Sequence, residues 1–158
     1  MIFIPSEYLP PVTRARESVE RRLSQLTQVA NAWEVTYRDN FADILQPQAD
    51  IETCLIGDGT TDIEQDASLT GMDEETWAFM AMCTCSRRLA NDDASIRKVV
   101  EVVLHAIRHL LLSDITQGGV AINTTIADYE IAESIAKGYY TGTLAFHLRI
   151  YNSRPEPF

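Results

Sequence analysis

The stretch YYTGTLAFHLRIY, residues 139–151, alternates between two kinds of side chain along its whole length. Successive side chains of a β-strand point to opposite faces of the sheet. A slip of one residue would move the whole apolar set into solvent, so the pattern predicts a strand with a fixed register. The even-numbered side chains are expected to face the core: Tyr140, Gly142, Leu144, Phe146, Leu148 and Ile150.

The residues before this stretch predict another strand and a long helix. A strand is expected over residues 121–131, joined to 139–151 by a turn that contains Gly138. Farther upstream, the run NDD at residues 91–93 can provide the N-cap of a helix that ends before Gly118. The apolar residues of this helix recur on one wide stripe: Ile96, Val99, Val100, Val103, Leu104, Ile107, Leu110 and Leu111.

The N-terminal half predicts an amphipathic helix followed by three strands. Apolar residues recur at steps of seven, four, three, four and three, which predicts a helix near residues 12–31. Alternation with period two predicts a strand over 33–37, and apolar runs predict strands over 51–56 and 76–86. The exposed side of the helix carries the basic residues Arg14, Arg16, Arg21 and Arg22.

Residues 57–75 contain seven acidic residues, three glycines and no basic residue. Such a composition opposes packing, so the stretch predicts a long mobile hairpin loop. The acidic side chains are those of Asp58, Asp62, Glu64, Asp66, Asp73, Glu74 and Glu75.

These elements follow the order α-β-β-β-α-β-β and predict an α+β fold. Short links favour antiparallel pairing, so we expect a mainly antiparallel sheet of about five strands with two helices packed on one face. The 158 residues suit a single domain over residues 1–158. Residues 1–11 are expected to form an N-terminal extension, and residues 153–158 a flexible tail.

The overall charge excludes some classes of partner. Acidic residues outnumber lysine and arginine by 23 to 13, and a formal charge of −10 repels nucleic-acid phosphates and anionic lipids. We therefore expect no sequence-specific nucleic-acid binding. Neither a signal peptide nor a membrane span is predicted, so the protein is expected to stay in the cytoplasm where it is made. Cys54, Cys83 and Cys85 form no metal or redox motif and are expected to be buried, reduced thiols.

The sequence does not predict an enzyme, a cofactor or a metal site. His105 and His109 are spaced to share a metal, but they lie opposite the apolar stripe and make no HExxH motif. The acidic stretch fails as an EF-hand, because its sixth and twelfth positions are Ile63 and Leu69. Phosphate-binding loops and GxSxG motifs are missing from the sequence, and no residue is assigned a catalytic role.

The pattern of elements resembles the tail terminator proteins of long-tailed bacteriophages and prophages. The resemblance covers about residues 12–152 and includes WEVTYRD at 33–39, the acidic hairpin, the helix at 96–112, and the pair AINTTIADYEIA and YYTGTLAFHLRIY. It implies a hexameric ring that caps the tail tube, stops its polymerisation and presents a surface to the head. The implied partners are the tail tube protein and the head-tail connector proteins. The implied location is the end of the tail nearest the head, after assembly from the host cytoplasm.

Local chemistry suggests how such a ring could be held together. A basic helix face and an acidic stretch on one subunit suit head-to-tail contacts, which salt or divalent cations would promote by weakening the repulsion between acidic copies. The alternatives are another head-tail joining or tail completion protein, and a small cytoplasmic enzyme. The interface candidates are Arg14, Arg21, Arg22, Asp58, Asp62, Glu64 and Asp66.

Overall fold

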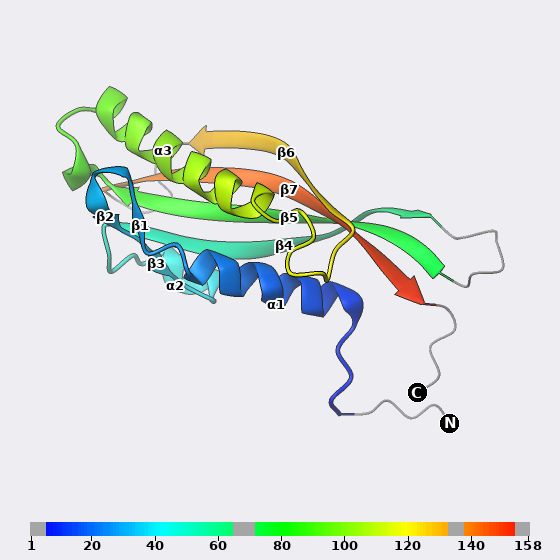
Figure 1. Ribbon diagram of the computed structural model, residues 1–158. Helices are drawn as coiled ribbons and strands as arrows, with labels where there is room; N and C mark the ends of the chain where they lie inside the picture. Colours follow the sequence, from blue (N-terminus) through cyan, green and yellow to red (C-terminus); the bar gives the residue numbers. More distant parts are fainter. Residues whose placement is uncertain (1–5, 65–71, 133–137, 154–158) are drawn as a thin grey trace.

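The computed structural model describes residues 6–64, 72–132 and 138–153, and its centre is a five-stranded sheet (Figure 1). The strand order is β3-β4-β5-β7-β6, so the last strand of the chain lies between β5 and β6. Only the β3–β4 pair is parallel, and the other three pairs are antiparallel. The bounds are Thr36–Tyr37 for β3, Ile51–Glu64 for β4, Met72–Ser86 for β5, Asn123–Ala132 for β6 and Tyr139–Ser153 for β7.

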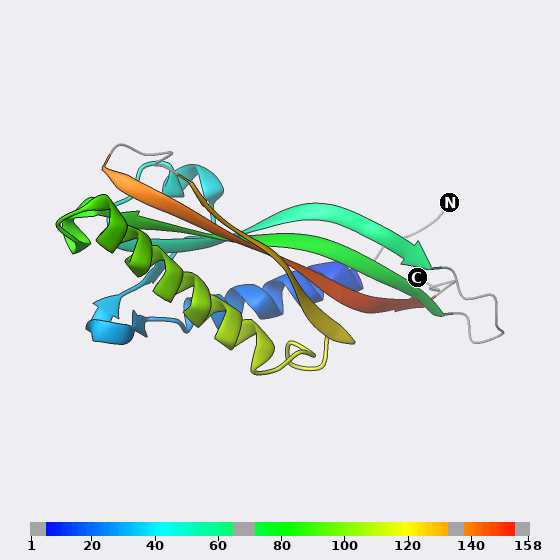
Figure 2. The ribbon, with the colours of Figure 1, turned by 90° about the horizontal axis from the view of Figure 1, so that it is seen from above.

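Two long helices cover one face of this sheet (Figure 2). The first, α1 at Pro11–Ser24, contacts β4 and β7, and the second, α3 at Asp93–Leu112, contacts β5, β6 and β7. A short third helix, α2 at Phe41–Ile44, lies on the opposite face against β4. The predicted α+β class and the five-stranded sheet are therefore confirmed, while the element order needs additions. These are α2, the 3₁₀ turn η2 at Arg87–Leu89, and a small second sheet.

The register predicted for the last strand is confirmed. Leu144, Phe146 and Leu148 are fully buried, whereas Thr143, Ala145 and His147 between them are partly exposed. On the neighbouring strand, Phe79 stacks on Phe146 with 5.7 Å between ring centroids. The helices thus pack on the even-numbered face of β7 and on the face of β5 that carries Phe79.

The second long helix also agrees with the sequence. Asp92 caps it, because its carboxylate accepts a hydrogen bond from the Ser95 N–H at 2.8 Å. Gly142 lets α3 approach the sheet closely, since a Cβ there would lie 2.5 Å from Cγ1 of Val100. The predicted apolar stripe is buried at Ile96, Val99, Val100, Val103, Leu104, Ile107 and Leu111.

The first helix is shorter than predicted. It ends at Ser24 rather than near residue 31, and the chain continues into the hairpin of β1 at Gln28–Val29 and β2 at Trp33–Glu34. The turn between them, η1 at Ala30–Ala32, places Asn31 and Ala32 at positive φ, which a helix does not allow. Leu26, which follows α1, and Val29 and Trp33 of the hairpin still pack on the core, and this explains why their spacing resembles a longer helical stripe.

Two further expectations about strands need correction. The strand predicted over 33–37 is divided into β2 and β3, which belong to different sheets. The stretch 57–75 was expected to be a loop, but β4 extends to Glu64 and β5 begins at Met72. Pairing with β5 supplies hydrogen-bond partners to the backbone of the acidic stretch. The strand has bulges between Gly57 and Gly59 and between Thr60 and Asp62.

Four short parts of the chain lie outside the described residues: 1–5, 65–71, 133–137 and 154–158. The expected tail at 153–158 therefore falls outside them, apart from Ser153 at the end of β7. Within the expected N-terminal extension, Pro11 is already the first residue of α1, the position that Pro favours.

Candidate interface surfaces

The basic residues predicted on the first helix fall into two groups in the structure. Arg14 and Arg21 are exposed, and neither forms an ion pair with the described residues. Arg22 instead turns toward the C-terminal end of α3, and only 17% of its side chain is exposed. Arg14 and Arg21 are thus free to meet a partner, whereas Arg22 is engaged within the subunit.

Arg22 holds the end of α3 and the loop that follows it. Its guanidinium donates hydrogen bonds to the carbonyl oxygens of Leu110 and Asp114, to the Ser113 hydroxyl at 2.7 Å, and to Oε1 of Gln117 at 3.0 Å. Helices leave their last four carbonyl groups without partners, and an arginine can satisfy some of them. Arg22 therefore fastens α1 to the C-terminal end of α3.

The loop itself is held by a second set of hydrogen bonds. Gln117 is fully buried, and its amide donates to the Leu111 carbonyl at 2.8 Å and to the Thr124 hydroxyl at 2.9 Å. The Ser18 hydroxyl of α1 donates to the Gln117 carbonyl. These bonds fix the loop between α3 and β6. One feature of the sequence indicates this arrangement: the pair Gly118 and Gly119 after the helix, both of which adopt positive φ.

Asp114 organises the exposed side of the same loop. Its carboxylate accepts hydrogen bonds from the hydroxyl and N–H of Thr116 and from the Gly118 N–H. These bonds, the Thr116 hydroxyl first, lower the pKa of Asp114, and the charge of Arg22 adds to the effect. The carboxylate stays ionised at neutral pH and keeps the loop in one conformation.

The acidic candidates lie at the far end of the β4–β5 hairpin. The backbones of Asp58, Asp62 and Glu64 belong to β4, with Asp62 opposite Thr76 and Glu64 opposite Glu74. Asp66 lies outside the described residues. Figure 1 shows this end of the hairpin extending beyond the helices, on the side of the molecule where α1 begins.

Two arginines connect the β4–β5 hairpin to α1 near Gly57 and to β7 near the far end. Arg16 lies over the ring of Phe79, with its guanidinium carbon 5.9 Å from the ring centroid, and it also contacts Gly57. On the other face, Arg149 of β7 forms an ion pair with Glu74. The hairpin is therefore held at both places, and Glu74 of the acidic stretch already has a cationic partner within the subunit.

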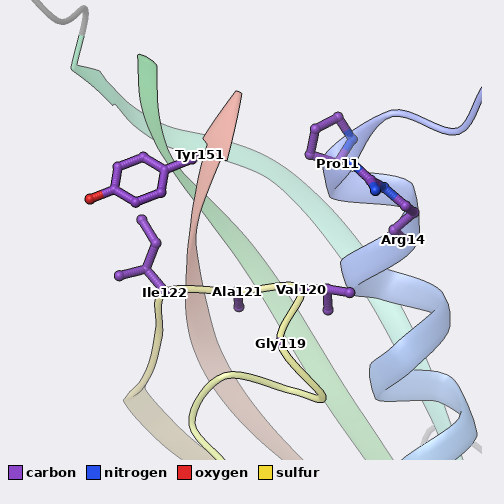
Figure 3. Close-up of a pocket in the computed structure, with 7 residues that line it drawn as sticks. All are labelled: Pro11, Arg14, Gly119, Val120, Ala121, Ile122 and Tyr151. Carbon is purple, nitrogen blue, oxygen red and sulfur yellow. The ribbon is translucent and has the colours of Figure 1, made fainter. Parts of the chain in front are cut away.

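A pocket lies at the start of α1, and the sequence had not indicated it. It has a volume of about 240 Å³, and Figure 3 shows Pro11 and Arg14 on one side and Ile122 and Tyr151 on the other. The fixed loop after α3 leads directly into Gly119, Val120 and Ala121, which complete the lining. The pocket thus combines apolar side chains with one arginine at its rim.

The titratable side chains of the described residues provide no metal site. No group of three or more His, Cys, Asp or Glu side chains in that part of the chain could hold a metal ion. Cys54, Cys83 and Cys85 are free and buried, as predicted, and burial raises the pKa of Cys54 to about 12. A hydrogen bond to Cys83 and burial raise the pKa of Cys85. The protonated thiols of Cys54 and Cys85 are therefore poor nucleophiles at neutral pH.

His105 and His109 are exposed on the outer face of α3, as predicted from their position opposite the apolar stripe. In the described parts of the chain, no helix has both the length and the apolar composition needed to cross a membrane. The surfaces that the structure defines are therefore the basic face of α1, the acidic hairpin and the pocket at the start of α1.

Comparison of the chain with protein-family models and with curated protein sequences found no match.

Proposed function

We propose that the protein is a structural subunit that assembles into a ring and serves as the tail terminator of a long-tailed bacteriophage. The observation that carries the proposal is the separation of charge within one subunit. Helices α1 and α3 together contain seven basic and four acidic residues, although the whole chain has a formal charge of −10. Residues 57–75 contain seven acidic residues and no basic residue.

Different patches on one subunit favour head-to-tail contacts. When an acidic surface of one copy meets a basic surface of the next, the same contact repeats, and it closes into a ring if the rotation permits. The exposed Arg14 and Arg21 supply cations that no described acidic residue neutralises. The acidic end of the hairpin projects away from the helices, where a neighbouring copy could meet it (Figure 1).

Attraction between the patches has to overcome repulsion between whole subunits. Six copies, each at −10, would carry a formal charge of −60. At physiological ionic strength, screening limits this repulsion to a range of about 8 Å, while close contacts between patches are weakened less. We therefore expect the ring to form more readily at physiological salt than at low salt, and magnesium to promote it further.

In the proposed role, the ring caps the finished tail tube and stops its polymerisation. One face of the ring would meet the tail tube protein, and the other would meet the head-tail connector proteins. The particle would then carry the protein at the end of the tail nearest the head. A scaffold of this kind needs complementary surfaces rather than a reactive site, which agrees with the surfaces found on the described residues.

Light scattering coupled to size exclusion tests self-assembly. The wild-type protein is measured from low to physiological salt, with and without magnesium, beside Arg21→Glu. The matched control is Arg88→Glu, which makes the same change of charge at a side chain that is 80% exposed in the turn η2, outside α1 and α3. We expect a closed oligomer, ideally of six chains, that Arg21→Glu weakens and Arg88→Glu preserves. A monomer under every condition at high concentration would contradict the ring.

A second experiment separates tail termination from another role in joining heads to tails. Removal of the protein from a phage that encodes it should yield tails of abnormal length if the protein stops polymerisation. Tails of normal length that fail to join heads would instead identify a joining or completion protein. Electron microscopy of the particles distinguishes the two outcomes.

A further inference from the structure

We infer that the apolar segment at residues 1–4 of one copy docks in the pocket at the start of α1 of a second copy. This inference rests on the self-assembly in the proposed function and names one of its contacts. The segment has the sequence MIFI and is followed by Pro5. It lies outside the described residues, whereas the pocket lies within them.

The pocket has the size and lining to take an aromatic side chain. Its volume is about 240 Å³, and a cavity of about 150 Å³ is large enough to hold a benzene ring. Val120 and Ile122 are half-buried, and 51% of Tyr151 is exposed, so apolar surface remains open to solvent at this place. Figure 3 shows that Ile122 and Tyr151 lie together on one side of the pocket.

The segment provides the matching chemistry. Met1, Ile2, Phe3 and Ile4 are consecutive large apolar residues, and their removal from water is favourable. Phe3 has the one aromatic ring among them, which makes it the side chain expected to fill the pocket. Aromatic side chains that fill such pockets often provide much of the binding free energy of an interface.

Charge also matches between the segment and the pocket. Glu7 follows the apolar segment, and it is exposed. Arg14 at the rim of the pocket is exposed and has no ion pair with a described residue. A segment that enters with Phe3 in the pocket can place Glu7 toward the rim, where Arg14 would neutralise it.

The direction of the chain favours the pocket of a second copy over its own. Residues 6–10 leave the start of α1 away from the sheet (Figure 1), and Figure 3 shows the chain before Pro11 leading away from Ile122 and Tyr151. Leu9 on this path is 43% exposed. The described residues 6–10 thus point away from the pocket of their own chain, which favours the pocket of a second copy.

Cross-linking between two differently tagged chains tests this arrangement. One full-length chain carries Phe3→Cys, the other carries Ile122→Cys, and the two are mixed under assembly conditions and oxidised. We expect a covalent dimer that contains both tags. Wild-type chains provide the background, because their three cysteines are buried. The matched control replaces Ile122→Cys by Leu45→Cys, an exposed position next to α2, and should give no such dimer.

Affinity provides an independent measurement. We expect Phe3→Ser and Ile122→Asp each to raise the concentration for half-assembly about tenfold, with the unfolding midpoint unchanged for Phe3→Ser. The control Phe41→Ser makes the same change at a phenylalanine that is 41% exposed on α2, and it should assemble like the wild type.

The outcomes separate this inference from the proposed function. Two results together would overturn the docking of residues 1–4 while leaving the ring intact. The first is normal ring formation by Phe3→Ser, and the second is no cross-link between the Phe3→Cys and Ile122→Cys chains. A cross-link within single chains that carry both cysteines, at a dilution where only monomer scatters, would assign the segment to its own pocket and also overturn the inference. A wild-type protein that stays monomeric would reject the ring itself, and the exchange between copies with it.

Discussion

The two faces of strands β5 and β7 differ sharply, although the same backbone pairing joins both. On the helix-covered face, Phe79 and Phe146 stack, and Leu144 and Leu148 are fully buried. On the other face, the side chains of the same strands are only half-buried along most of the sheet, and most of them are small or polar. Examples are Thr76, Ala78, Thr143, Ala145 and His147.

The difference shows that the covering helices, rather than the strands, determine where the main core lies. The uncovered face has a small core of its own only where α2 reaches it, at Ile44, Cys54 and Met82. Elsewhere its half-buried residues could tolerate change. Substitutions on each of the two faces, and substitutions that weaken the contact of the helices with the sheet, therefore test whether the helices determine where the core lies.

The largest effect is expected at the centre of the covered face. Phe146→Ala removes a fully buried ring that stacks on Phe79, and it should lower the free energy of unfolding by about 3–5 kcal/mol. Thr143→Ala on the same strand faces the other way and should cost far less. Denaturant unfolding of both variants measures the difference, and equal small shifts of the midpoint would contradict the register.

The next effect is expected where α1 is fastened to α3. Arg22→Met removes hydrogen bonds from a charged group to four partners and should lower the free energy of unfolding by about 2–3 kcal/mol. The neighbouring Arg21→Met changes an exposed side chain and should leave the free energy of unfolding nearly unchanged. If both variants unfolded at the same denaturant concentration, the fastening role of Arg22 would be wrong.

Gly142 tests how closely α3 must approach the sheet. Gly142→Ala places a methyl group against Val100, Leu104 and Cys83, and overpacking of this kind costs about 1–3 kcal/mol. The reverse change on the uncovered face, Ala145→Gly, removes a methyl group and creates no clash. The midpoint temperature of thermal unfolding should be lower for Gly142→Ala than for Ala145→Gly. The reverse order would show that α3 can move to make room for the methyl group.

The smallest effect concerns the cap of the covering helix and depends on pH. Hydrogen bonds from the N–H and hydroxyl of Ser95 lower the pKa of Asp92, so the ionised form favours the folded state. This contribution is present above about pH 4, the ordinary range for Asp, and is lost as the pH falls through the lowered pKa. Asp92→Asn keeps an acceptor at the cap but not the charge.

The unfolding midpoints of wild type and Asp92→Asn should therefore differ at about pH 5 and converge toward about pH 2. A difference that stayed constant over this range would show that the charge of Asp92 does not contribute.

Periodicity made most of the covered face predictable. The alternation in residues 139–151 and the stripe from Ile96 to Leu111 each arise from burial on one side of an element, so they can be read without knowledge of the neighbours. The end of the first helix could not be read in this way. Leu26 reaches the same core from the link after α1, and Val29 and Trp33 reach it from a hairpin. Their spacing does not show that the backbone is no longer helical.

The interface surfaces were predictable as charges but not as geometry. The sequence places Arg14, Arg21 and Arg22 on one helix, yet only the contacts of Arg22 with residues about 90 positions away separate it from the other two. The acidic stretch was recognised by composition, but its strands depend on pairing with β5, which composition does not encode. The pocket at Pro11 and Tyr151 joins distant parts of the chain and therefore has no local signal.

The position of β7 has a consequence for synthesis of the protein on the ribosome. The β4–β5 hairpin joins near neighbours and can form early, but β5 receives its second partner only when residues 139–153 have been made. Until then, β5 and β6 present unpaired backbone that could join another nascent chain. Pairing between such distant segments also tends to fold slowly. We therefore expect the sheet, and the surface on which both helices pack, to be completed late in folding.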